Sequence, residues 1–495
     1  MRSIVTLCLL AFPLAAAAAG DALTIYSSAQ PGAIRPEQYR DGGGGAVPGY
    51  AVVRHLRELE LVPGQNTVRF SDVAALIDPT TVSFESLTDP KGTRVIEQNF
   101  QFDLVNTQKL LEKYIDRTIS VDQVRGSGVE TFRGTLLSTA GGYVLRREDG
   151  SVQLLSGSAG VRLPELPGGL ITRPTLVWDV VAARGGKQKA RVSYQTGGIT
   201  WWADYNLAYS EGANANACKL DVGAWVSILN RSGAGYDEAK LKLVAGDVQR
   251  AQPPGYAREA LAAAGPMLAN KVAGFEEKAF FEYHLYTLGR PTTLPDRSTK
   301  QIELFPVARG VPCEKKLVYY GLAPGWRGFG PSPITDRNYG VQTNKKVDVY
   351  LAFENAKRNN MGMPLPAGRV RVSKADDDGT LEFIGEDAID HTPKDETIRL
   401  YTGNSFDLVG ERKRTDYRVD NNRRTFDESF EIKVRNHKKE RVEVRVVEHL
   451  YRCENWQIVS KTDGYRKIDA NQIEFPVTIP ADGEATVRYT VHYTW

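Results

Sequence analysis

The feature that most constrains the fold is the stretch Gly197 to Arg250, where apolar residues recur at every second position. One such run covers Trp201 to Tyr209 and a second covers Leu220 to Ile228. A repeat of two places these side chains on one face of a strand. Asn230 to Gly235 supplies turn-forming residues, and a third run starts with Leu241 to Val244. We therefore expect a three-stranded meander with one buried face.

The last third of the chain repeats this alternation, which predicts an Ig-like sandwich of two sheets. The alternating runs are Val347 to Phe353, Phe430 to Val434, Val442 to Val446, Ile473 to Ile479 and Val487 to Trp495. Helix is sparse: the best candidate is Asn106 to Tyr114, where Asn106 or Thr107 can cap the first turn. The predicted class is all-β and multidomain.

The chain is too long for one ordinary core, because it has 495 residues. Its 41% hydrophobic and 25% charged residues are typical of a folded protein. A proline- and glycine-rich linker at 164–174 marks the clearest boundary. We expect an N-terminal β domain with a Gly-rich loop and one short helix at 20–117, a small β-barrel-like unit at 118–170, a β-sheet or sandwich at 175–325 and the C-terminal β-sandwich at 326–495.

Residues 1–19 resemble a secretory signal peptide, with Arg2, an apolar run from Ile4 to Leu14 and small residues up to Ala19. The apolar run is shorter than the ~20 residues that span a bilayer. We therefore expect an exported protein, periplasmic or secreted, without a transmembrane segment in the mature chain. The formal net charge of +3 is too small to favour a nucleic-acid partner.

Three cysteines follow the leader, Cys218, Cys313 and Cys453. Export permits one disulfide and one remaining thiol, but the spacing does not identify the pair. They form no CxxC pair of the kind that binds zinc, and the six histidines lack metal-site spacing. Neither a GxSxG motif nor a phosphate-binding loop is present. The sequence predicts no catalytic residues, metal or cofactor.

Two features are weak candidates for ligand binding. The basic run Arg412, Lys413 and Arg414 could bind an acidic polysaccharide or lipid headgroups, although solvated edge strands also carry such charges. Trp202 points away from the apolar face of its strand and could stack on a sugar ring, but packing against a neighbouring domain is the favoured interpretation. Asp376 to Gly379 fits a hairpin turn better than a calcium loop.

Two segments have compositions that leave their order open. Ser28 to Gly49 contains four consecutive glycines and is typical of a mobile loop or the tip of a ribbon. Ala251 to Ala273 is rich in alanine and interrupted by proline, which favours an exposed insertion with a short helix at 258–264.

Several ordered blocks of sequence resemble the domain-of-unknown-function 4139 family, over about residues 174–495. They include YQTGGITWWADYNLAY, VSILNRSGAGYDEAKLKLVAGDVQR, FEEKAFFEYHLYTLGRPTTLPDRSTKQIELF, MGMPLPAGRVRV and VTIPADGEATVRYTVHYTW. The resemblance implies a bacterial exported protein, and relatives described as mucoidy inhibitors imply a link with the cell envelope or exopolysaccharide. The front of this chain differs from the coiled-coil-containing front of those relatives. The family supplies no catalytic or ligand residues.

These observations favour a non-enzymatic cell-envelope protein that serves as an interaction module or a scaffold. Its expected partner is an envelope protein or a polysaccharide. The alternative is a carbohydrate-active protein that binds or cleaves an acidic envelope polysaccharide through Arg412 to Arg424 and exposed aromatic residues.

Overall fold

The computed structural model describes residues 20–26, 31–34, 47–165, 167–168, 170–246, 248, 275–322, 333–341 and 343–495. The predicted all-β class is confirmed: several sheets, none closed into a barrel, and one α-helix make up this part of the chain. The leader 1–19, most of the Gly-rich segment 28–49 and the insertion 251–273 with its predicted helix lie outside the described residues.

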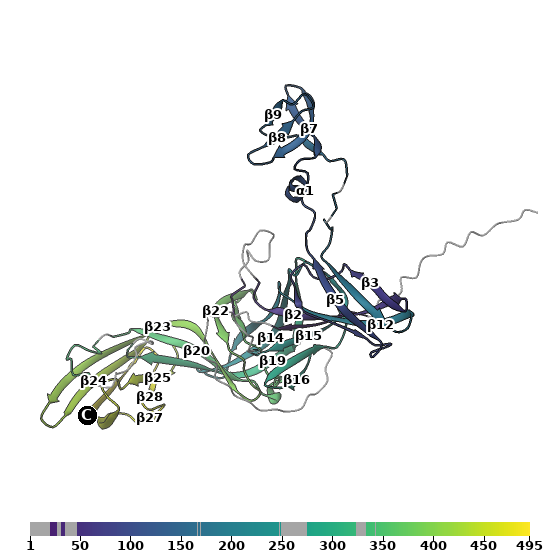
Figure 1. Cartoon of the computed structure of the whole chain (residues 1–495). Helices are drawn as coiled ribbons and strands as arrows, with labels where there is room; N and C mark the ends of the chain where they lie inside the picture. The colour runs from purple at the N-terminus through teal and green to yellow at the C-terminus, as the bar shows by residue number, and fades with distance from the viewer. Residues whose placement is uncertain are drawn as a thin grey trace, which may run out of the picture.

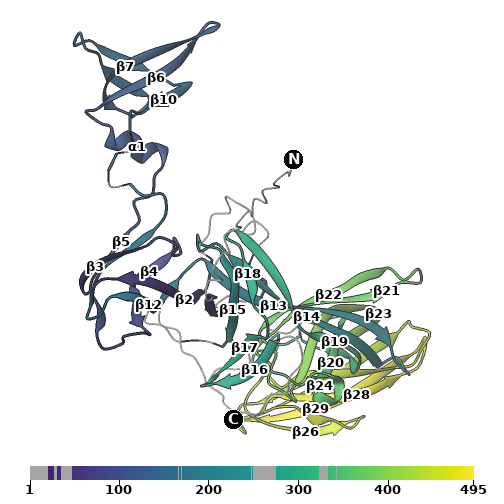
Figure 2. The same cartoon turned by 90° about the vertical axis from the view of Figure 1, so that its right-hand side faces the viewer.

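Three parts are visible in both views of the molecule (Figures 1 and 2). A central body carries most of the early and middle strands. A C-terminal sandwich extends from one side of the body, and a small unit stands apart from it at the end of a narrow connection.

The body contains an eight-stranded sheet and a three-stranded sheet. In the larger one, the first described strand, β1, lies between β2, its antiparallel neighbour, and β15, its parallel neighbour. Its strands are β1 (Ala22–Tyr26), β2 (Tyr50–Leu61), β4 (Ile77–Ser86), β12 (Gly186–Thr196), β15 (Tyr236–Ala245), β16 (Phe275–Phe280), β17 (Tyr283–Leu288) and β18 (Thr292–Leu294). The smaller sheet consists of β3 (Gly64–Phe70), β11 (Thr175–Ala182) and β5 (Thr93–Gln101).

A thirteen-stranded sheet continues from the body into the C-terminal sandwich. Two strands, of 23 and 24 residues, run through both parts: β19 (Ser298–Tyr320) and β23 (Thr397–Asp420). The others are β13 (Ile199–Glu211), β14 (Ala217–Asn230), β20 (Lys346–Glu354), β21 (Gly368–Ala375), β22 (Leu381–Ile389), β24 (Thr425–Asn436), β25 (Val442–His449), β26 (Asn455–Lys461), β27 (Arg466–Lys467), β28 (Gln472–Ile479) and β29 (Glu484–Thr494). A 3-10 turn, η2 (Lys357–Asn359), follows β20.

The predicted meander is correct for two strands and wrong for the third. β13 and β14 pair along their full length. The third run forms β15, which pairs with β1, β17 and β18 in the other sheet. The chain changes direction at Asn230, whose side-chain amide donates hydrogen bonds to the carbonyls of Ala234, Leu294 and Pro295. The expectation of one buried face is also wrong for Ile199 to Tyr205, where every residue is buried.

One apolar core runs through the body, from Leu23 to Leu400. The ranges 20–117 and 175–325 share both sheets and this core, because β1 pairs with β15 and β2 pairs with β12. A second core, built from alternating residues such as Phe430, Ile432 and Val434, fills the C-terminal sandwich. The predicted sandwich is consistent with this layout, because one set of alternating side chains from each strand points inward.

The small unit is inserted between two neighbouring strands, β5 and β11. It begins with α1 (Thr107–Lys113), whose predicted cap is confirmed: the Asn106 side chain accepts a hydrogen bond from the Lys109 backbone. Five strands follow in the order β10-β6-β7-β8-β9, forming an open sheet around a separate core. They are β6 (Thr118–Arg125), β7 (Gly128–Ser138), β8 (Tyr143–Arg146), β9 (Val152–Leu155) and β10 (Gly160–Arg162).

Cys218 and Cys313 form a disulfide between directly opposed positions of β14 and β19, while Cys453 is a buried free thiol. Over the residues described, no helix has both the length and the apolar character needed to cross a membrane.

Candidate functional site

The three basic candidates Arg412, Lys413 and Arg414 differ in how far they are buried. Arg412 is only 2% exposed, so the expectation that it binds a ligand at the surface is wrong. Its Nε donates to the Glu448 carboxylate at 2.8 Å, and its guanidinium lies 3.9 Å from the centre of the Phe430 ring. Burial lowers the pKa of Arg412, but the charge and hydrogen bond of Glu448 together with Tyr489 and Tyr451 raise that pKa overall. The reason is the alternation of β23, which turns Arg412 inward and leaves Lys413 exposed.

Arg414 is half-buried and shares a second internal carboxylate. Its Nη1 lies 3.2 Å from Oε1 of Glu428, and the fully buried Arg452 donates to the same oxygen at 2.8 Å. Arg452 also donates to the carbonyls of Ile334, Asp336 and Tyr339. Arg452, together with Arg412, which donates to the Gly340 carbonyl, therefore holds the segment 333–341 against the sandwich, which is a structural role.

Trp202 is buried, as the packing interpretation expects. It lies against Ile34, Leu229 and Val47 in a small apolar cluster. Its indole Nε1 donates to Asp204 at 2.7 Å. The covering segment is the described part of the Gly-rich loop, so the side chain that points away from the main core is not available for stacking on a sugar.

A different place combines exposed aromatic and polar side chains: the connection between the body and the small unit, which we call the neck. The neck consists of the described residues among 102–106 and 164–172 (102–106, 164–165, 167–168 and 170–172), which leave β5 and return to β11. Leu104 and Ile171 form an isolated parallel bridge, and the Val105 amide donates to the Ile171 carbonyl at 2.9 Å. Two chain segments joined by backbone hydrogen bonds thus carry the small unit.

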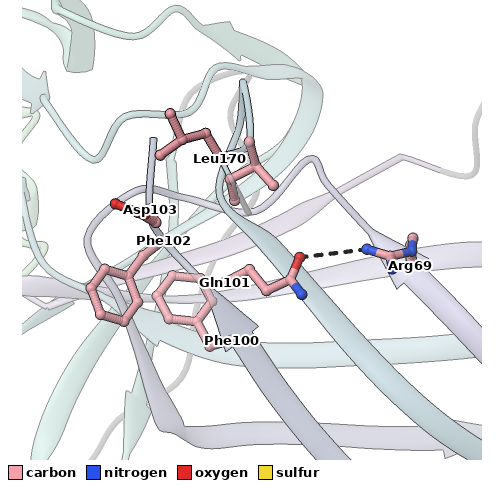
Figure 3. A pocket seen from close by; sticks show the side chains of 7 residues that line it. Arg69, Phe100, Gln101, Phe102, Asp103 and Leu170 are labelled. Atoms are coloured by element: carbon pink, nitrogen blue, oxygen red, sulfur yellow. Dashed lines mark hydrogen bonds between the residues drawn. The ribbon is translucent and has the colours of Figure 1, made fainter. Parts of the chain in front are cut away.

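A shallow pocket of about 410 Å³ lies where the neck meets the body. Phe100 and Phe102 stack with ring centres 5.8 Å apart, and Phe102 is 69% exposed. Arg69 reaches the Gln101 side-chain oxygen at 3.4 Å on the other side of the pocket (Figure 3). Asp103, Leu170 and Ile171 complete the lining. The pocket therefore places the faces of two phenyl rings next to a positively charged guanidinium, a negatively charged carboxylate and a neutral amide.

Asp103 also joins the pocket to the helix of the small unit. Its carboxylate accepts a hydrogen bond from Lys109 at 2.6 Å, and this bond lowers the pKa of Asp103. Lys113 adds a second, longer ion pair at 3.9 Å. The carboxylate is thereby kept ionised and oriented at the pocket rim.

This pocket was hidden in the sequence because its lining comes from β3, from the end of β5 with the two residues after it, and from residues 170–171, which are far apart in the chain. The available signal was Phe102, an apolar residue placed one position past the end of β5. The part of the chain that the structure describes contains no group of three or more side chains arranged to hold a metal ion.

Comparisons with protein-family models, curated proteins and solved structures found no match for this chain.

Proposed function

We propose that this protein is a non-enzymatic, exported cell-envelope protein that acts as an interaction or scaffold module. The observation that carries the proposal is the small unit, which stands away from the body on the two-stranded neck (Figure 2). Such an arrangement presents a surface to a partner at a distance from the core, and it is typical of recognition elements placed on a rigid scaffold.

The surface of the small unit supports this role because it exposes apolar side chains. Val124 and Val129 are opposite each other at the end of the β6–β7 hairpin, and each is 63% exposed. Val152 and Leu154 are exposed on β9, the end strand of the same sheet. Exposed apolar positions on an end strand are suited to contact with another protein.

Export is supported by the leader-like residues 1–19 and by the Cys218–Cys313 disulfide. Disulfides persist in oxidising compartments such as the periplasm and are rare in the cytosol. The resemblance of residues 174–495 to an exported family, which stays a prediction, is a further reason for proposing the envelope assignment.

The test is capture of envelope partners by the full-length protein in its native host. We expect Val124→Ser together with Val129→Ser to abolish the cross-linked partners that the unmodified protein retains. Val62→Ser with Val459→Ser is the matched control, because both valines are exposed elsewhere. Unchanged capture by the hairpin variant would overturn the proposal. So would turnover of a glycan or ester substrate that disappears on mutation of one acid pair.

The neck pocket favours a second candidate, a carbohydrate-binding role. Stacked phenyl rings beside Arg69, Gln101 and Asp103 combine the flat apolar surface and the hydrogen-bonding groups that a sugar ring requires. The version that uses Arg412 is not retained, because Arg412 is buried. A glycan array should show binding that Phe102→Ala removes and Phe281→Ala, an exposed phenylalanine on another hairpin, preserves.

A further inference from the structure

We propose that the first half of β22, Leu381 to Ile384, is a docking surface for a cationic, extended protein segment with alternating apolar residues. This inference deepens the interaction role proposed above and places a second contact on the body, away from the small unit. It specifies the chemical class of the partner at that contact.

The first observation is exposure of an apolar strand. Four consecutive residues are exposed, including Leu381 at 60% and Phe383 at 62%, so neither face of this half-strand is covered. Isolated surface leucines are common, but adjacent large apolar side chains on one strand mark an interaction site.

The second observation is that this half-strand lies at the end of its sheet. β22 pairs with β21 on one side and is the last strand in the sheet order. Its second half approaches β23, where Asp387 accepts a hydrogen bond from the Tyr401 amide and Gly385 lies against Thr402. The free edge is therefore confined to the first half, which leaves room for a short added strand.

The third observation is charge, which identifies the occupant. Residues 375–396 contain nine carboxylates and a single lysine. Two of these carboxylates, Glu386 and Asp395, have ion pairs with basic side chains, to Arg369 and Arg371 and to Lys394. Asp376, Asp377 and Glu382 are exposed beside or close to Leu381 in the chain, and the lysine opposite Glu382 on β21, Lys374, is paired with Glu211. An apolar strand surrounded by negative charge is complementary to a partner that alternates basic and apolar side chains.

The same charge argues against other occupants. A second copy of this surface, an acidic polysaccharide and an anionic lipid headgroup would all bring negative charge against negative charge. Like-charge contact disfavours association, whereas a lysine-bearing segment gains attraction on approach.

The experiment measures binding of a short synthetic peptide that alternates lysine and valine to the full-length protein, by fluorescence anisotropy. We expect Leu381→Ser with Phe383→Ser to weaken binding by about tenfold or more, because two buried apolar contacts are lost. We also expect Asp376→Asn, Asp377→Asn and Glu382→Gln combined to weaken binding and to reduce its dependence on salt.

Two matched variants act as controls. Phe281→Ser removes an exposed phenylalanine from the β16–β17 hairpin, and Glu440→Gln, Glu454→Gln and Glu484→Gln remove the same charge from exposed positions of the C-terminal sandwich. Both should bind the peptide like the unmodified protein. Binding that either control weakens equally, or equal binding of a glutamate–valine peptide, would overturn the proposal.

Absence of peptide binding, or self-association through β22 seen in sedimentation, would overturn it as well. The Val124 and Val129 variants leave β22 unchanged, so they should retain peptide binding. Failure of this proposal is thereby distinguishable from failure of the proposed function of the small unit.

Discussion

Arg412 and Glu448 form a buried ion pair, so removing one of the two charges should destabilise the fold. Glu448→Gln would leave the buried guanidinium of Arg412 without its carboxylate. We expect a loss of about 3 kcal/mol in the free energy of unfolding, measured by urea denaturation.

The matching double variant, Arg412→Met with Glu448→Met, should cost less than Glu448→Gln, since it leaves no unpaired charge. If the double variant instead costs as much as the two single methionine variants added together, the two side chains are not coupled and this interpretation is wrong.

The lowered pKa of Asp21 predicts how the free energy of unfolding of the body depends on pH. Burial would raise the pKa of Asp21, but the hydrogen bond and charge of His55 and the charge of Arg57 lower it overall below its usual 3.8. The contribution of Asp21 to stability is therefore complete above that value and is lost as the pH falls through the lower, folded pKa.

We expect Asp21→Asn to reduce the free energy of unfolding by about 1 to 3 kcal/mol near neutral pH. The difference from the unmodified protein should shrink below pH 3.8. Urea denaturation over a pH series measures it, and a difference that grows in acid would contradict the assignment.

At the scale of elements, β23 must pass directly over a tyrosine of β19. A Cβ atom at Gly410 would lie 2.0 Å from the Tyr319 ring, which is buried and held by a hydrogen bond from its hydroxyl to the Asn344 carbonyl. Gly410→Ala should therefore destabilise the sandwich by about 1 to 3 kcal/mol in thermal denaturation. Gly464→Ala, where nothing lies within 4 Å, is the control. If Gly410→Ala and Gly464→Ala change the thermal stability equally, a small movement of the Tyr319 ring or of β23 relieves the close approach and the prediction is wrong.

Alternation predicted the strands of the meander and of the C-terminal sandwich, because a repeat of two is set by local geometry. It identified β13, β14, β20 and β24. The α1 cap was predicted from the capping residue Asn106, whose side chain bonds a neighbour three residues away. Alternation did not predict that β15 joins β1, because such pairing depends on residues more than two hundred positions away. The inward direction of Arg412 was equally hidden, since its partner Glu448 lies on another strand.

At the scale of the whole molecule, the small unit should be separable from the body. Gln101 and Thr175 are paired across β5 and β11, so a short turn can replace residues 104–171. We expect this deletion to keep the strand-rich circular dichroism spectrum and the main thermal transition, because the body core contains no residue of the small unit. Loss of soluble, folded protein would show instead that the small unit is needed for the body to fold.

The position of β1 has a consequence for the order of folding. β1 precedes every other strand that the structure describes, yet Ala22 pairs with Lys240. The eight-stranded sheet cannot be completed until the chain beyond that residue has been synthesised, whereas every strand pairing in the small unit lies within residues 118–162. Contacts over short sequence distances form faster than distant ones. The small unit can therefore fold before β1 of the body has paired with β15.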